Sequence, residues 1–96
     1  MANALNNLGN IALDQAAYAH AIALFEQSLV LRRAAGDREG AAASLNNLAA
    51  VAAAQGNDER ALALYEESAA VIRATDNTTM LAHVLANMDE VARRNV

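Results

Sequence analysis

The sequence predicts an all-α protein of about two and a half helix–turn–helix units, stacked side by side as five antiparallel helices. Three observations support this fold class. The chain of 96 residues contains 26 alanines but only three aromatic residues, a composition that favours closely packed helices over a sheet. It repeats itself with a period of forty residues. Within each repeat, apolar residues recur at spacings of three and four, as on the buried face of a helix.

The repeat is visible when each residue from 1 to 56 is compared with the residue forty positions later. This comparison gives 19 identities in 56 pairs, and the motif LNNL occurs at both 5–8 and 45–48. A period of roughly 20–50 residues is typical of stacked repeat architectures. We therefore interpret residues 1–96 as a single domain with units at 1–37 and 38–77 and a half unit at 78–96.

The first two helices are predicted over residues 2–15 and 18–35, separated by a polar break that begins at Gln15. Apolar residues define the buried face that we expect for each helix. In the first helix these residues are Leu5, Leu8, Ile11 and Ala12, and in the second they are Ala21, Leu24, Phe25, Ser28 and Leu31.

The other three helices are predicted over residues 38–55, 58–74 and 78–94. Gly36 followed by Asp37 has the pattern of a helix-ending glycine and an N-capping aspartate, and Gly56 with Asn57 repeats it. Residues 75–78 supply the last turn. Because all the loops are short, successive helices should run antiparallel.

Composition excludes several classes of function. The net charge of −4 and the presence of only three aromatic residues argue against a nucleic-acid partner, which would need a basic patch and stacking rings. No apolar run approaches the ~20 residues of a membrane span, and no signal-peptide pattern opens the chain. We expect a cytoplasmic protein without membrane contact. The absence of cysteine excludes disulfides and thiolate metal sites.

These residues resemble the tetratricopeptide repeat family. Its pattern of a large residue, then Leu-Gly, then small and aromatic residues is matched by the following residues. They are Leu5, Leu8, Gly9, Ala12, Ala21 and Phe25 in the first unit, and Leu45, Leu48, Ala49, Ala52, Ala61 and Tyr65 in the second. The proline expected near the end of each unit is missing, and leucine and alanine fill the first aromatic positions. The forty-residue period is similar to that of kinesin light chains, Leu-Gly-Asn repeat adaptors and bacterial signalling regulators.

The resemblance implies a right-handed superhelix in which the first helix of every unit lines a concave groove. The polar residues Asn3, Asn7, Asn10 and Asp14 share a helix face that differs from the leucine face, and Asn6 borders it. With their equivalents in later units, they make a candidate partner-binding set. It comprises Asn3, Asn6, Asn7, Asn10, Asp14, Asn46, Asn47, His83, Asn87, Glu90 and Arg94.

The role of the repeated asparagines has two interpretations. An amide offers two donors and an acceptor without charge, which suits the backbone of a bound peptide. The resemblance implies this role, because asparagines at this place in kinesin light chains and similar repeats hold the ligand backbone. Alternatively, Asn7 and Asn47 hydrogen-bond to the neighbouring unit and fix the superhelix.

Other kinds of site find little support. Family members that bind chaperone carboxylates use basic residues where this chain has Asn6, His83 and Asn87, so we exclude that partner class. His83, Asn87 and Glu90 have metal-like spacing but lack a second convergent ligand, and we expect no metal or cofactor. No phosphate loop or catalytic motif occurs.

We therefore expect a non-enzymatic scaffold module that binds a protein or peptide in its groove. The alternative is a regulatory, sensory or self-assembling segment of a larger bacterial signalling protein. The last helix carries Asp89, Glu90, Arg93 and Arg94 on its outer side, whereas the first helix has no such polar cover. Since a solenoid end needs a polar cap, we expect either a longer repeat array or a homo-oligomer that buries the terminal helices.

Overall fold

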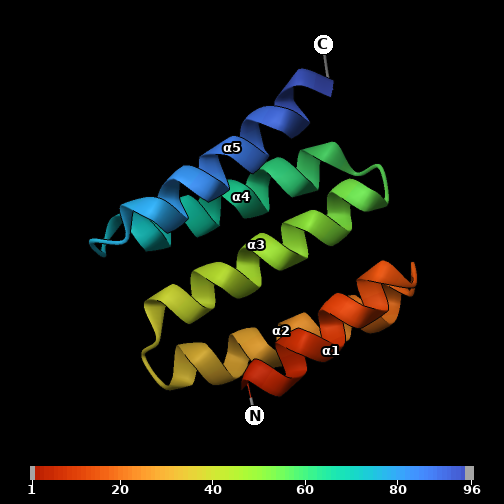
Figure 1. The fold of residues 1–96 in the computed structure, drawn as a ribbon, viewed down its shortest axis with the longest axis horizontal. Helices are drawn as coiled ribbons and strands as arrows, with labels where there is room; N and C mark the ends of the chain where they lie inside the picture. Colours follow the sequence, from red (N-terminus) through yellow and green to blue (C-terminus); the bar gives the residue numbers. More distant parts are fainter. Residues whose placement is uncertain (1, 95–96) are drawn as a thin grey trace.

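A computed structural model describes residues 2–94, and within them it contains five helices and no strand (Figure 1). The helices are α1 (Ala2–Asp14), α2 (Tyr18–Ala34), α3 (Arg38–Ala54), α4 (Asp58–Arg73) and α5 (Thr78–Arg94). The predicted all-α class is confirmed, and every helix begins at its predicted residue and ends within one residue of the prediction.

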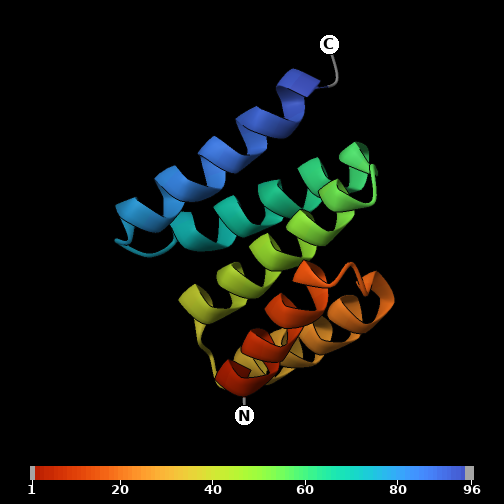
Figure 2. The same cartoon turned by 45° about the vertical axis from the view of Figure 1, so that its right-hand side comes forward.

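The helices form a flat stack with extents of 38 × 32 × 17 Å, in which neighbours along the chain pack against each other. α1, α3 and α5 lie on one side of the stack, and α2 and α4 lie on the other (Figures 1 and 2). We call the surface formed by α1, α3 and α5 the first-helix face. This arrangement places the candidate residues, which all lie on those three helices, on one side of the molecule.

Tight turns join the helices through a repeated backbone conformation. Gly36 and Gly56 adopt positive φ angles of 70° and 80°, as expected for glycines that end helices. Ala16 adopts a φ of 59° at the position equivalent to Gly56, although a side chain makes this conformation unfavourable. The first turn therefore achieves the same geometry with a less suitable residue.

Polar side chains cap the N-termini of the last three helices. Asp37 accepts a hydrogen bond from the Gly40 amide at 2.9 Å, and Asn57 accepts one from the Arg60 amide at 3.2 Å. Asn77 accepts one from the amide of Met80 at 3.0 Å. These bonds satisfy amides that have no partner within the helix. The equivalent residue before α2 is Ala17, which makes no such bond.

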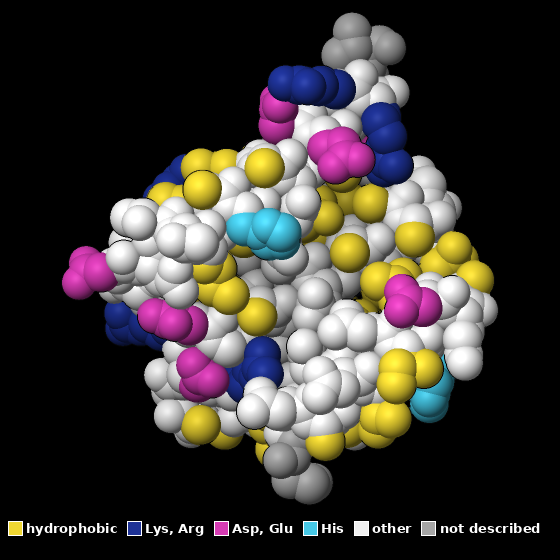
Figure 3. Space-filling model, in the orientation of Figure 1, with side chains coloured by type: hydrophobic (Ala, Val, Ile, Leu, Met, Phe, Trp, Pro, Cys, Tyr) yellow, Lys and Arg dark blue, Asp and Glu magenta, His cyan; other side chains and the backbone are white. Residues whose placement is uncertain are grey.

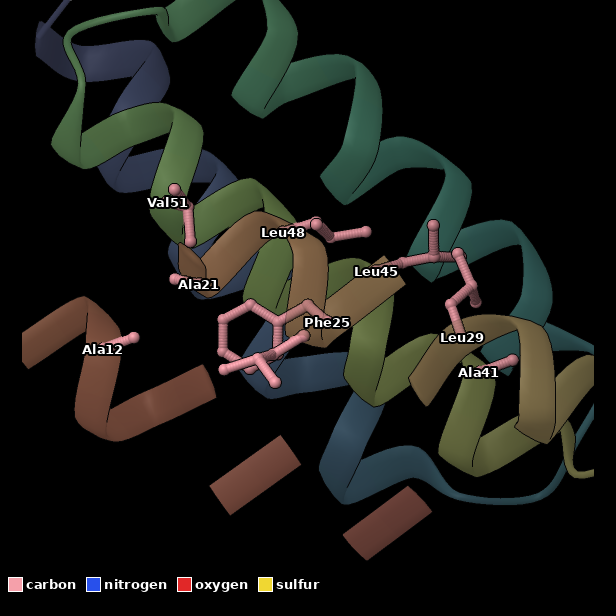
Figure 4. Close-up of a cluster of buried hydrophobic side chains, with 9 residues drawn as sticks. Ala12, Ala21, Phe25, Leu29, Ala41, Leu45, Leu48 and Val51 are labelled. Carbon is pink, nitrogen blue, oxygen red and sulfur yellow. The ribbon is translucent and has the colours of Figure 1, made fainter. Parts of the chain in front are cut away.

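The core lies between the two helix layers and is centred on Phe25, whose side chain is fully buried (Figure 4). Gly9 of α1 packs directly on the Phe25 ring, and a Cβ atom added to Gly9 would approach the ring to within 2.6 Å. Ser28 and Ser68 are fully buried, as close helix contact requires. Ser68 donates to the carbonyl of Ala42 at 2.7 Å.

The expected buried faces need a correction at the first unit. Leu8 and Ile11 were expected in the core but are 52% and 53% exposed, and Leu31 is 40% exposed. Their equivalents Leu48 and Val51 are buried, because α2 covers that side of α3. Among the described residues no helix lies on the corresponding side of α1. The apolar face of α1 is therefore partly exposed.

Candidate partner-binding surface

Asparagine side chains link the three helices of the first-helix face. Asn47 Nδ2 on α3 donates to Asn6 Oδ1 on α1 at 2.7 Å. Forty residues on, Asn87 Nδ2 on α5 donates to Asn46 Oδ1 on α3 at 3.3 Å. Each bond joins the residue at the second position of the repeated pair, Asn47 or Asn87, to the first asparagine of the preceding repeat. We call this series of amides the asparagine ladder.

The ladder uses only part of the hydrogen-bonding capacity of its amides. Each amide group can donate two hydrogen bonds and accept two. Among the described residues, Asn47 and Asn87 show no hydrogen bond to Oδ1, and Asn6 and Asn46 show none from Nδ2. All four residues are half-buried, and among the described residues no side-chain nitrogen or oxygen is both buried and without a partner, so these groups retain contact with solvent. The inter-repeat bond and a contact with a ligand backbone are therefore compatible.

A pocket opens between α3 and α5 beside the ladder. Three alanines of α3 form one wall, and α5 forms the other. Its lining residues are Ala50, Ala53, Ala54, Tyr65, Asn87, Glu90, Val91 and Arg94. The candidate residues Asn87, Glu90 and Arg94 thus meet around one hollow, because their spacing of three and four places them on the same side of α5.

Tyr65 of α4 reaches this pocket from the opposite layer. Burial raises the pKa of its hydroxyl above the usual value, the charge of Glu90 raises it further, and Arg94 opposes the shift. Arg94 also forms an ion pair with Asp58 in the first turn of α4, at 2.8 Å. The pocket lining therefore includes a tyrosine, a glutamate and an arginine beside the three alanines of α3.

Asn3 has a structural contact. Its Oδ1 accepts a hydrogen bond of 2.8 Å from the guanidinium of Arg32, which also donates to the carbonyl of Gly40 at 2.8 Å. Arg32 is 9% exposed, and no carboxylate pairs with it among the described residues. Asn3 thus helps to satisfy a buried cation that ties α1, α2 and α3 together.

The remaining candidates lie apart from this pocket. Asn7, Asn10 and Asp14 are exposed along α1, and His83 is exposed near the start of α5. Figure 3 shows the molecule from the first-helix side, with a hollow near the middle of the view and largely uncharged surface around it. No group of three histidine, aspartate or glutamate side chains in residues 2–94 could hold a metal ion.

The candidate set drawn from the sequence omits Tyr65 and the alanines of α3 that line the pocket. Tyr65 occupies an aromatic position of the family resemblance, and its 4% exposure places it in the core. Tyr65 nevertheless lines the pocket. The small size of Ala50, Ala53 and Ala54 was a usable signal, because small side chains on α3 leave space between this helix and α5.

Comparison with known protein families identifies one matching family model. Residues 1–74 match the family model described as tetratricopeptide repeat. A comparison with curated proteins gives no match. None of the helices within residues 2–94 is long and apolar enough to cross a membrane.

Proposed function

The chain belongs to the tetratricopeptide repeat family, whose repeats generally mediate protein–protein interaction, and we propose that it binds an extended peptide segment of a partner protein across the first-helix face. The peptide would cross α1, α3 and α5 and place one side chain in the pocket that Tyr65 lines. In this proposal the protein has no catalytic role.

The asparagine ladder is the observation that carries the proposal. Its amides follow one another across three helices and keep donors and acceptors unused by the ladder itself. A peptide in extended conformation also offers backbone donors and acceptors at regular intervals. Because a neutral amide can pair with either group, the ladder suits a peptide backbone better than it suits one particular side chain.

The lining of the pocket between α3 and α5 would favour one kind of side chain on the bound peptide. Glu90 and Arg94 provide both signs of charge at its rim, while Ala50 and Ala53 keep its wall apolar and small. A side chain with an apolar stem and a polar end would fit this frame. Partners should therefore share a backbone requirement along the ladder and a side-chain preference at one position.

Selection from a displayed library of random peptides tests the proposal. Enriched peptides would be titrated by calorimetry against the natural chain and against Ala50→Leu, which fills the pocket wall without removing a ladder amide. We expect Ala50→Leu to weaken binding by at least about tenfold, equal to about 1.4 kcal/mol.

Ala63→Leu is the matched control, because Ala63 is exposed on α4 and lies outside the first-helix face. It introduces the same side chain on the other layer and should leave binding unchanged. Peptides that bind Ala50→Leu as tightly as the natural chain, or that lose binding to Ala63→Leu, would place the binding surface elsewhere and overturn the proposal.

A further inference from the structure

The turn between α1 and α2 has the same backbone hydrogen bonds as the turn between α3 and α4, but less suitable residues. The amides of Ala16 and Ala17 donate to carbonyls of α1 at 2.9 and 2.8 Å. Those of Gly56 and Asn57 donate to carbonyls of α3 at 3.0 and 2.9 Å. Ala16 adopts a positive φ in which its Cβ is unfavourable, and Ala17 offers no side-chain acceptor to α2. The α1–α2 turn is therefore strained and uncapped.

The sequence around this turn favours a continuous helix. Residues 10–24 contain six alanines and neither glycine nor proline, and alanine has the highest helix propensity. Ala17 has a φ of −86°, near the helical range, and departs from a helix mainly through its ψ of 69°. If Ala16 and Ala17 took helical angles, α1 and α2 would join into one helix over residues 2–34, about 50 Å long. In that form α1 would leave its place in the stack of its own chain.

A second copy offers α1 the same place to pack. α1 packs mainly along α2 and also reaches α3 (Figure 2). It is held there by contact of Gly9 with the Phe25 ring and by the hydrogen bond from Asn47 to Asn6. The residues that receive α1 lie on α2 and α3, so α1 of a second copy can make the same contacts with them. An exchange of α1 between two copies therefore loses none of these contacts.

The exchange also relieves the strain of the turn. Two copies that exchange α1 open two such turns, and each opening replaces a residue at positive φ by ordinary helix. Short connections under strain favour domain swapping, and swapping is a low-cost route to a dimer because it reuses the contacts of the monomer. The cost that remains is the loss of freedom on association, which a higher protein concentration offsets.

We propose that the chain forms a dimer by exchanging α1, with α1 and α2 of each copy joined into one helix. The two long helices run antiparallel, and α1 of each copy packs on α2 and α3 of the other. The small side chains of Ala16 and Ala17 allow the two helices to lie close where they pass each other. The partner in this inference is a second copy of the chain, and the strained turn is the hinge.

The exchange changes how the first-helix face is built. Asn6 then comes from one copy and Asn47 from the other, so the hydrogen bond that joins α1 to α3 becomes intermolecular. Each dimer carries two complete first-helix faces, joined by the long helices. Binding at both faces would raise the avidity for a partner with two binding segments. The exchange itself does not depend on peptide binding.

Refolding from urea at high protein concentration, followed by analytical ultracentrifugation, tests the exchange. We expect a dimer for the natural chain refolded at about 1 mM, and mainly monomer after refolding at about 1 µM. Ala16→Gly with Ala17→Asn gives this turn the residues of the α3–α4 turn. The pair should raise the dimer dissociation constant by about a hundredfold, roughly tenfold for each of the two turns.

Spin labels on Ala4→Cys and Ala34→Cys measure whether α1 has moved. The chain has no native cysteine, and both alanines are exposed. In the hairpin these ends of α1 and α2 lie together, since Arg32 donates to Asn3 at 2.8 Å. In the fused helix the two labelled positions lie about 45 Å apart. Labelled chain diluted in excess unlabelled chain should therefore give the long intrachain distance in the dimer and a much shorter one in the monomer.

Ala19→Gly is the matched control, because Ala19 is exposed and helical whether or not α1 is exchanged. It should lower the melting temperature but leave the dimer dissociation constant unchanged. A natural chain that stays monomeric after refolding at about 1 mM overturns the inference. So does a dimer that keeps the short label distance, or one that Ala16→Gly with Ala17→Asn weakens no more than Ala19→Gly does, because the copies would then associate through another surface.

Discussion

Asn47 Nδ2 lies 2.7 Å from Asn6 Oδ1, and this hydrogen bond joins the first helices of successive repeats. Asparagine lowers helix stability by roughly 0.5 kcal/mol per residue relative to alanine, so the two asparagines of one ladder bond together cost about 1 kcal/mol. A net hydrogen bond contributes about 1 kcal/mol, which is enough to offset that loss. The ladder thus accounts for Asn6 in the middle of α1 and Asn47 in the middle of α3, but not for Asn7, which has no ladder partner.

A double-mutant cycle on Asn6 and Asn47 should detect this bond directly. We expect a coupling free energy of about 0.5–1.5 kcal/mol between Asn6→Ala and Asn47→Ala, measured by urea unfolding. Each single change also gains helix propensity, so only the cycle separates the two effects. The Asn46 and Asn87 pair should couple more weakly, because its separation is 3.3 Å.

Asn7→Ala provides the control for the ladder. Asn7 is exposed and has no ladder partner, so its replacement by alanine should raise the free energy of unfolding by about 0.5 kcal/mol. A coupling near zero between Asn6 and Asn47, or a clear loss of stability in Asn7→Ala, would contradict the structural role assigned to the ladder.

Gly9→Ala should destabilise the protein even though alanine is the better helix former. A Cβ at Gly9 would lie 2.6–2.9 Å from three carbons of the buried Phe25 ring, and a ring at 0% exposure has little room to move. Overpacking of this kind typically costs about 1–3 kcal/mol, more than the roughly 1 kcal/mol gained in propensity. Urea unfolding of Gly9→Ala should therefore show a net loss.

Replacing Phe25 by the smaller leucine tests whether contact with the ring causes the stability loss in Gly9→Ala. Phe25→Leu alone lowers stability, but Gly9→Ala should cost less in a Phe25→Leu background than in the natural chain, because the clash is gone. Equal costs in both backgrounds would show that the ring contact is not responsible.

Placing the residues of the α3–α4 turn in the α1–α2 turn should raise the stability of the protein. Ala16 has a φ of 59°, where Gly56 has 80°, and Ala17 has φ −86° and ψ 69°, close to the −91° and 75° of Asn57. Ala16→Gly relieves an unfavourable conformation, and Ala17→Asn supplies an N-cap acceptor for α2. Together they should raise the free energy of unfolding by about 1–2 kcal/mol in urea titrations.

The reverse exchange in the α3–α4 turn should lower the free energy of unfolding. Gly56→Ala with Asn57→Ala recreates the first-turn sequence and should lower stability by a similar amount, since Asn57 loses its bond to the Arg60 amide. No change in either double variant would mean that the turns tolerate both residue pairs equally.

The helices and the family were predictable from sequence because local signals and the forty-residue period agreed. Capping residues and glycines set the helix ends to within one residue. The exposure of Leu8 and Ile11 was not predictable in this way. Periodicity identifies the apolar face of a helix, but whether another helix covers that face depends on its place in the stack.

The candidate site was only partly accessible to sequence reasoning. The spacing of Asn87, Glu90 and Arg94 predicts that they share one face of α5, and all three line the pocket between α3 and α5. Their role in binding a partner stays a prediction. The pairing of Asn47 with Asn6 crosses 41 residues and depends on how α1 and α3 are offset, which no local pattern specifies. Similarly, Asn3 was grouped with the groove residues, but its bond to Arg32 depends on the packing of α2.

Stability should fall at high pH through Tyr65. Burial and the charge of Glu90 raise the pKa of Tyr65 in the folded protein above its usual value of 10.0. The folded state then holds this proton more tightly than the unfolded state does. The resulting stability is complete below about pH 10 and is lost as the pH rises through the folded-state pKa, at up to about 1.4 kcal/mol per pH unit. Urea unfolding between pH 8 and about 11 measures this loss.

Tyr65→Phe isolates the contribution, because the hydroxyl alone is removed and Phe25 fills the equivalent position forty residues earlier. The variant should lose less stability than the natural chain as the pH rises above about 10. Glu90→Gln should show an intermediate dependence, since it removes one of the two causes that raise the pKa of Tyr65. If natural and Tyr65→Phe chains lose stability in parallel, the Tyr65 hydroxyl is as well solvated in the folded state as in the unfolded one, and the floor of the pocket is open to water.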